Sequence, residues 1–268
     1  MSLTSLPVTA ITIFTRDWVF PSLFCKLIGV FQGGSVFVSS FTLTAIAVDR
    51  YFLIRYPARQ TLSYGTAVTI VMLIWIFGYA CASPAGILSI IDVYYASDYH
   101  QYCGIFCEEK WPDFDGNRMR KTYGTSVLII QFGLPLLISS ICYWMIGRII
   151  REQLEKRKKH QTLLESNQQK LENRKSRSSR MMIAMVGGLV LAWLPMNLVN
   201  LYRDYFLDSI HPSYSLIFAG CHVVAMTSAV WNPIIYSWFN PQFRSTLKNA
   251  FARNAHMSMR YNAMLLER

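Results

Sequence analysis

An apolar stretch from Cys25 to Tyr51 constrains what this chain can fold into more than any other part of the sequence. It reads CKLIGVFQGGSVFVSSFTLTAIAVDRY, and its charged residues lie only near its two ends. As an α-helix with a rise of about 1.5 Å per residue it is roughly 38 Å long, enough to cross a bilayer core of about 30 Å. The stretch therefore predicts a membrane-spanning helix with a cysteine near one end and Asp49-Arg50-Tyr51 at the other.

Other apolar segments of similar length follow, and the composition supports the same class of fold. The chain is 53% hydrophobic and 15% charged, whereas soluble domains are about 25% charged. The segment at 3–14 is apolar but only roughly 18 Å long as a helix, so it predicts half a span. We expect an all-α membrane protein with full spans at about 22–54, 66–89, 123–150, 181–203 and 213–238.

The segments between and after these spans are polar. The stretch at 91–122 is acidic and aromatic and predicts a long loop, whereas the stretch at 151–180 is basic. Residues 241–252 place apolar side chains on one face at helical spacing and predict a short amphipathic helix. A transmembrane domain is thus expected over residues 1–253, followed by a tail at 254–268.

The net charge of +11 is distributed unevenly across the predicted membrane. Acidic residues outnumber basic ones on the side that carries 91–122, and the opposite side is strongly basic. Basic loops stay in the cytoplasm, so we expect a multi-pass plasma-membrane protein with a cytoplasmic C-terminus. The sequence has no basic-aromatic interleaving and no zinc-finger spacing, which argues against nucleic acid as a partner.

The six cysteines divide between the predicted outer side and the apolar spans. Cys25, Cys103 and Cys107 lie on the outer side, where a disulfide can form between two of them. The other three lie inside apolar spans and are expected to be small packing residues; they are Cys81, Cys142 and Cys221.

Several short motifs, in order along the chain, resemble those of rhodopsin-like (class A) G-protein-coupled receptors. Asp49-Arg50-Tyr51 resembles their D-R-Y motif, Trp193-Leu194-Pro195 their W-x-P motif, and Asn232-Pro233-Ile234-Ile235-Tyr236 their N-P-x-x-Y motif. The resemblance starts in the middle of the family's second helix and covers essentially the whole chain. It implies a seven-transmembrane receptor bundle, truncated at the N-terminus, that lacks helix 1 and the inner half of helix 2 and has 241–252 as helix 8.

Within this family the polar residues of the spans narrow the class of ligand. Amine receptors have an aspartate where this chain has Gln32, and opsins have a lysine in the span that corresponds to 213–238, where this chain has none. The polar residues and the run CEEKWP at 107–112 resemble neuropeptide Y and neuropeptide F receptors instead. This resemblance implies an extracellular peptide that ends in arginine-aromatic-amide, bound by Gln32, Gln131, Asn200, Asp204 and His222, with Thr9 and Thr12 beside them.

The resemblance also assigns roles to single residues. Asp204 is expected to pair with the arginine of the peptide, because a carboxylate accepts a guanidinium group on two oxygens. Cys25 is expected to bond to Cys107 rather than to Cys103. The expected activation switch consists of Asp49 as the resting partner of Arg50, followed by Tyr51, Tyr143, Trp193, Pro195, Asn232, Pro233 and Tyr236. Ser39 and Asn232 resemble a sodium pocket whose central aspartate is missing, so no metal is expected.

The expected function is signalling through a heterotrimeric G protein, with the basic inner face also in contact with membrane lipid and with a second receptor chain as a further partner. No cofactor is expected, and no motif of an enzyme is present. Three alternatives stay open: a receptor for another peptide class, a truncated fragment that does not signal, and a fragment of a transporter. A transporter would be expected to show an internal repeat, and none is visible.

Overall fold

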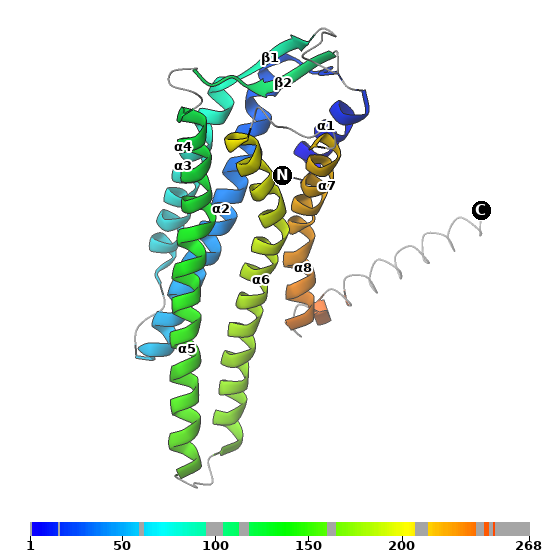
Figure 1. Cartoon of the computed structure of the whole chain (residues 1–268). Coiled ribbons are helices and arrows are strands. Elements are labelled where there is room, and N and C mark those ends of the chain that lie inside the picture. The colour runs from blue at the N-terminus through cyan, green and yellow to red at the C-terminus, as the bar shows by residue number, and fades with distance from the viewer. Residues whose placement is uncertain are drawn as a thin grey trace, which may run out of the picture.

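Long helices that run side by side form most of the molecule (Figure 1). The computed structural model describes residues 2–15, 17–58, 62–94, 104–112, 118–159, 165–206, 214–239, 244–246 and 249. Within these residues, five helical stretches are long and apolar enough to cross a membrane, which confirms the five predicted spans. They are Ser22–Arg55, Tyr64–Leu88, Arg118–Gln153, Ser179–Tyr205 and Leu216–Phe239.

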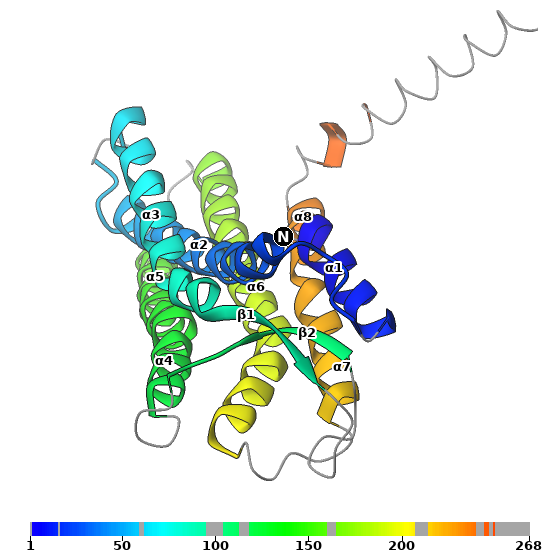
Figure 2. The ribbon, with the colours of Figure 1, turned by 90° about the horizontal axis from the view of Figure 1, so that it is seen from above.

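The helices follow the predicted spans in order along the chain. Helix α1 (Ser2–Thr15) is the expected half span, and it contacts α2 (Ser22–Arg55) and α7 (Tyr214–Met226) (Figure 2). Next come α3 (Tyr64–Leu88), a continuous stretch made of α4 (Arg118–Leu128), η1 (Ile129–Gly133) and α5 (Leu134–Lys159), and then α6 (Glu165–Tyr205) and α8 (Ser228–Phe239).

Two prolines explain irregular points in these helices. Pro135 has no N–H to donate to the carbonyl of Gln131, and here the chain forms the single-turn π-helix η1. The freed Gln131 carbonyl accepts a hydrogen bond of 2.6 Å from the Ser40 hydroxyl of α2. In the same way Pro84 frees the carbonyl of Ala80, which accepts from Ser83 at 2.8 Å. Side chains thus satisfy backbone groups that lipid could not.

The expected loop at 91–122 is the main departure from the sequence-based expectation. It contains an antiparallel hairpin of β1 (Ser89–Tyr94) and β2 (Gly104–Glu109), in which Ser89 pairs with Glu109 and Tyr94 with Gly104. The hairpin lies across one end of the bundle, here called the hairpin end (Figure 2). The loop expectation was wrong for these residues because acidic and aromatic composition says nothing about strand pairing, which joins residues distant in sequence. Helix α4 also begins earlier than the expected position 123.

Other boundaries shift modestly. Helix α6 begins at Glu165 and so extends well beyond the apolar part that starts near 181. The last span is interrupted at Thr227, whose backbone N–H contacts the carbonyls of both Val223 and Val224. Of the expected amphipathic helix at 241–252, only 244–246 and 249 are described, and they are helical; the tail at 254–268 lies outside the described residues.

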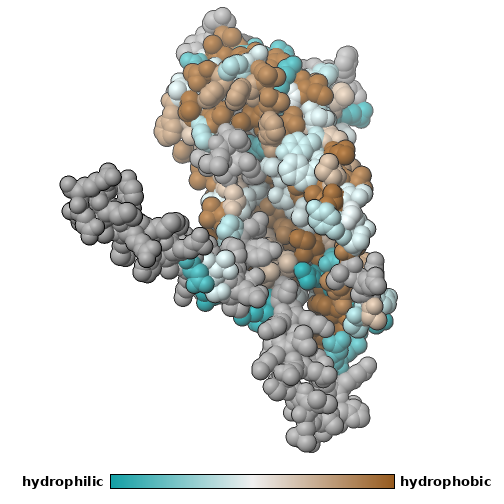
Figure 3. All heavy atoms as spheres, turned by 180° about the vertical axis from the view of Figure 1, so that it is seen from behind, coloured by the Kyte–Doolittle hydropathy of each residue, from teal (hydrophilic) through white to brown (hydrophobic). Residues whose placement is uncertain are grey.

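Three buried clusters hold the bundle together at different depths. One packs α1 against the hairpin end through Val8, Trp18 and Cys25. The second surrounds Trp193 in the middle of the bundle. The third joins α2, α5, α6 and α8 near the opposite end; its fully or nearly buried members include Ala47, Ile146 and Met185. Apolar side chains also cover much of the outer surface, as expected for helices that face lipid (Figure 3).

Candidate functional site

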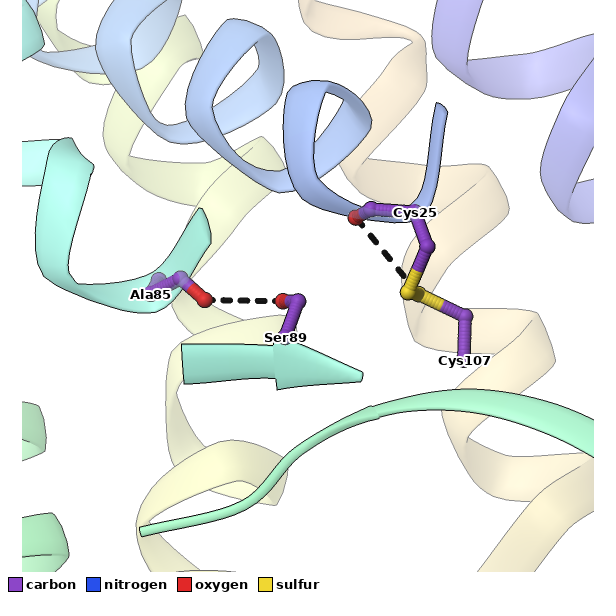
Figure 4. Close-up of a disulfide and its surroundings, with 4 residues drawn as sticks. All are labelled: Cys25, Ala85, Ser89 and Cys107. Atoms are coloured by element: carbon purple, nitrogen blue, oxygen red, sulfur yellow. Dashed lines mark hydrogen bonds between the residues drawn. A yellow bond between two sulfur atoms is a disulfide. The ribbon is translucent and has the colours of Figure 1, made fainter. Parts of the chain in front are cut away.

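A disulfide fastens the hairpin to the start of α2. Cys25 and Cys107 are bonded, which confirms the predicted pair, and Cys25 is only 1% exposed (Figure 4). Two hydrogen bonds also tie β2 to the segment before α2: the Trp18 N–H donates to the Ile105 carbonyl at 2.6 Å, and the Ile105 N–H donates to Asp17 Oδ1 at 2.7 Å. The disulfide and the two hydrogen bonds therefore fix the hairpin across one end of the bundle.

An exposed ion pair joins β1 to the residue that follows β2. Lys110 Nζ lies 3.2 Å from Asp92 Oδ2, and this hydrogen bond lowers the pKa of the Asp92 carboxyl. The pair therefore contributes fully above the ordinary carboxyl pKa, and its contribution is lost as the pH falls through the lowered value. Both side chains are exposed, so the contribution to stability is small.

The predicted acid Asp204 lies at the hairpin end of α6 and is already paired within the protein. It is 5% exposed, and its Oδ1 accepts from Arg120 Nε of α4 at 3.0 Å. Arg203 Nε and Nη2 lie 3.3 Å from the same oxygen. The sequence-based expectation named Asp204 but not these partners. The only feature of the sequence that pointed to these partners was a group of basic residues at 118–121 on the otherwise acidic side of the chain.

Further contacts surround this acid. The Tyr205 hydroxyl lies 3.1 Å from Thr125 Oγ1, and the Lys121 ammonium lies 5.8 Å from the centre of the Tyr205 ring. On α7 the hydroxyl of Tyr214 is buried and has no hydrogen-bond partner in the described part of the chain. Burial raises the pKa of this phenol, and the charges of Arg203, Arg120 and Asp204 affect it less. Helices α4 and α6 thus meet at one carboxylate, and Tyr214 of α7 lies within electrostatic range of it.

Deeper in the bundle, the predicted polar residues fall into two groups. Gln32 Nε2 lies 3.4 Å from His222 Nε2 and links α2 to α7. Gln131 is buried and uses its amide on the Gly33 carbonyl at 3.3 Å, which links η1 to α2. Asn200 is half-buried on α6, one turn before Asp204. Gln32, His222 and Asn200 therefore lie on three different helices, whereas Gln131 is hydrogen-bonded to the backbone of α2.

The two threonines of α1 are half-buried. Thr12 donates its hydroxyl to the Val8 carbonyl of its own helix at 2.9 Å, so that group is engaged within α1. Thr9 is one residue from Val8, which belongs to the cluster under the hairpin. Both positions therefore lie near the mouth of the bundle, without a contact to Asp204.

Trp193 occupies the middle of the bundle below these residues. Its indole Nε1 donates to Ser228 Oγ of α8 at 3.1 Å, and its backbone carbonyl accepts from Asn197 Nδ2 at 2.8 Å. Pro195 lies between Trp193 and Asn197, where a missing N–H permits a kink. The side chain therefore connects α6 to α8 beside the point where α6 is able to bend.

At the end opposite the hairpin, the structure shows no ion pair between Asp49 and Arg50 among the described residues, and their pairing stays a prediction. Consecutive residues on a helix point in different directions. The buried hydroxyl of Tyr143 has no hydrogen-bond partner among the described residues. Tyr51 packs against the neighbouring cluster.

The remaining predicted residues give less information. Ser39 donates to the Ser35 carbonyl of its own helix at 2.8 Å. Asn232 and Tyr236 lie on α8, but their side chains are outside the described part. Pro233 is inside α8. In the described residues, no group of three or more His, Cys, Asp and Glu side chains gathers as a metal site.

The fold, the disulfide and the motif positions are those of heptahelical membrane receptors, of which the described residues form five full spans and the half span α1. Residues 1–236 match the model of the family described as "7 transmembrane receptor (rhodopsin family)". The chain therefore belongs to the rhodopsin family of seven-transmembrane receptors and is a membrane receptor rather than an enzyme.

The chain is similar to curated neuropeptide receptors. It is 58% identical to neuropeptide receptor 3 of Caenorhabditis elegans, over 94% of this chain and 66% of that protein. It is 30% identical to the neuropeptide F receptor of Drosophila melanogaster, over 98% of this chain and 55% of that protein. It is 31% identical to neuropeptide Y receptor type 6 of Oryctolagus cuniculus, over 90% and 65%. The chain thus spans less than two thirds of the length of these relatives.

Among solved structures, the chain is similar to squid rhodopsin. The match has a TM-score of 0.75 and covers 94% of this chain and 71% of that chain. The sequence identity is 23%, so the likeness speaks for the fold alone.

Proposed function

We propose that this protein is a plasma-membrane receptor for an extracellular amidated neuropeptide and that it signals through a heterotrimeric G protein. The observation that carries the proposal is the buried carboxylate of Asp204 at the hairpin end, which accepts hydrogen bonds from guanidinium groups of α4 and α6. A buried acid that accepts guanidinium groups is suited to a peptide with an arginine near its C-terminus. The similarity to neuropeptide F and neuropeptide Y receptors supports the same class of ligand.

In this proposal the peptide enters under the hairpin with its C-terminal end first. The arginine pairs with Asp204, and the terminal amide reaches the polar pair of Gln32 and His222 between α2 and α7. In this proposal Asn200, one helical turn before Asp204 on α6, also binds the terminal amide. Acidic residues of the hairpin region favour the approach of a basic peptide through long-range attraction.

The orientation follows from chemistry at the two ends. The disulfide is expected on the oxidising outer side, and the basic segments, including the C-terminus, are expected in the cytoplasm. The G protein would then bind near Arg50 and Tyr143, where the third cluster now packs α6 against α2 and α5. Binding there requires the bundle to change between two states.

The test is a G-protein activation assay with a panel of arginine-aromatic-amide peptides on cells that display the receptor. Asp204→Asn should raise the half-maximal concentration of a responding peptide about 30-fold or more, the loss of about 2 kcal/mol expected when one partner of a buried pair is removed. Asp92→Asn is the matched control, because this acid is exposed on the hairpin. Surface expression without a response to any such peptide would exclude this ligand class.

A further inference from the structure

The acid that the proposed function assigns to the ligand is occupied by the receptor itself. Arg120 of α4 and Asp204 of α6 are 84 residues apart in sequence, and their side chains are 16% and 5% exposed. An ion pair this well buried is costly to break by removing one partner, because the other charge then stays unpaired in a poor solvent. Exchanging one guanidinium group for another avoids that cost.

The packing around the pair shows that α4 is shaped to approach this carboxylate. Both arginines donate to Oδ1 of Asp204, whereas Oδ2 lies against Gly124, where an added Cβ would collide with it. Gly124 lies one helical turn after Arg120, so a position without a side chain faces the acid at this contact. The close approach therefore depends on the glycine and on the arginine together.

The residues that follow Arg120 and Gly124 on α4 also contact the residue that follows Asp204 on α6. Thr125 lies within hydrogen-bond distance of the Tyr205 hydroxyl, and Lys121 lies over the Tyr205 ring. Residues 120, 121, 124 and 125 of α4 thus form one contact surface against 204 and 205 of α6, here called the α4–α6 contact. Separation of Arg120 from Asp204 would remove the only buried ion pair that the α4–α6 contact has among the described residues.

We propose that Arg120 occupies Asp204 in the unliganded receptor in place of the arginine of the ligand, and that the ligand displaces it and thereby loosens the α4–α6 contact. This inference rests on the proposed function, in which the ligand brings a guanidinium group to Asp204. Arg120 then determines specificity, because a ligand without a comparable cation cannot replace it. Release of α4 frees the hairpin end of α6, and Pro195 and Trp193 lie further along the same helix.

The first test compares Arg120→Gln with Arg203→Gln. Both variants remove a positive charge from the same carboxylate oxygen, but Arg203 belongs to α6 itself, so only Arg120→Gln releases α4. We expect Arg120→Gln to increase the potency of an arginine-aromatic-amide peptide about tenfold, within the range usual for coupled sites. This increase should exceed the one that Arg203→Gln produces. Equal or lower potency than Arg203→Gln would overturn the proposal.

A second arm tests competition by charge. The same peptide with citrulline in place of arginine keeps the shape of the side chain but is neutral, so it gains nothing at a vacated Asp204. We expect Arg120→Gln to leave its potency within about twofold. An equal gain for both peptides would mean that Arg120 acts by some route other than competition, which contradicts the inference.

A third variant alters the contact without changing any charge. Gly124→Ala should push the carboxylate away from α4 and raise the potency of the arginine peptide in the same direction as Arg120→Gln. Gly147→Ala of α5 is the control, since an added Cβ there has no neighbour within 4 Å. Unchanged potency in Gly124→Ala would count against the proposal.

A readout without ligand separates this inference from the proposed function. Melting temperatures of the unliganded receptor should show that Arg120→Gln and Asp204→Asn are strongly non-additive, because each removes the same ion pair. Additive losses would show that the pair does not form and would overturn the inference. If the losses are non-additive but no arginine peptide activates the unmodified receptor, the proposed function fails, and the displacement step fails with it.

Discussion

Single side chains in this receptor connect helices that the sequence keeps far apart. The indole of Trp193 reaches Ser228 on α8, and Ser40 of α2 takes the carbonyl that Pro135 frees in η1. Each of these bonds joins two spans at a point where one helix departs from regular geometry. Hydrogen bonds between membrane helices contribute on average only about 0.6 kcal/mol, so their value lies in fixing which faces meet.

At this scale we predict that Ser228→Ala lowers the melting temperature of the purified receptor by about 1–3 °C, through loss of the bond from Trp193. Ser83→Ala is the control, because the Ser83 hydroxyl bonds to its own helix at Ala80 rather than to a neighbour. A larger effect in Ser83→Ala than in Ser228→Ala would show that the Trp193–Ser228 bond does not stabilise the bundle.

At the scale of elements, the association of α2 with α3 depends on residues that have no side chain. An added Cβ at Gly34 would approach ring atoms of Tyr79 to 2.6 Å, and one at Gly78 would approach Phe37 Cβ to 3.1 Å. Small residues let membrane helices come close, because no hydrophobic driving force exists between them in lipid. The position of α2 at the centre of the bundle is therefore set partly by these glycines.

Gly34→Ala should destabilise the receptor by about 1–3 kcal/mol, the usual cost of overpacking, and lower its thermal melting point by several degrees. Gly29→Ala on the same helix is the control, since nothing lies within 4 Å of its added Cβ. Combining Gly34→Ala with Tyr79→Ala should restore part of the loss. If Gly29→Ala and Gly34→Ala melt alike, close packing at Gly34 is not the cause.

On the scale of the whole molecule, the bundle is closed at the end opposite the hairpin. The third cluster packs Met181, Met182 and Met185 of α6 against α2 and α5. Arg50 remains exposed beside it. Under the proposed function, binding of a G protein at this end would require this packed interface to open, and the cluster would oppose that opening.

Ile146 is the central residue for testing this cluster, because its side chain is 0% exposed. Ile146→Ala should cost about 2–5 kcal/mol through the cavity that it leaves, measured as a loss of thermal stability in the unliganded receptor. Ile141→Ala on the same helix makes the identical change at a position that is 45% exposed toward lipid, and should cost far less. Similar losses in the two variants would contradict a packed interface at this depth.

Much of the architecture could be predicted from the sequence because hydropathy and charge are local properties. A span is visible as a run of apolar residues, and the family motifs lie within such runs. The pairing of Cys25 with Cys107 was predicted through the resemblance to receptors and is confirmed. The hairpin of β1 and β2 was missed, since its register pairs Ser89 with Glu109 across an intervening segment.

The sequence by itself determined that this protein crosses the membrane, in which order its helices do so, and to which receptor family it belongs. Only the tertiary structure decided which partner each polar group has. Asp204 was visible as an acid at the end of a span. Its pairing with Arg120 depends on the contact of two helices, and the two residues are 84 positions apart in sequence. Burial of a charge demands a partner, and only packing in three dimensions determines which residue supplies it.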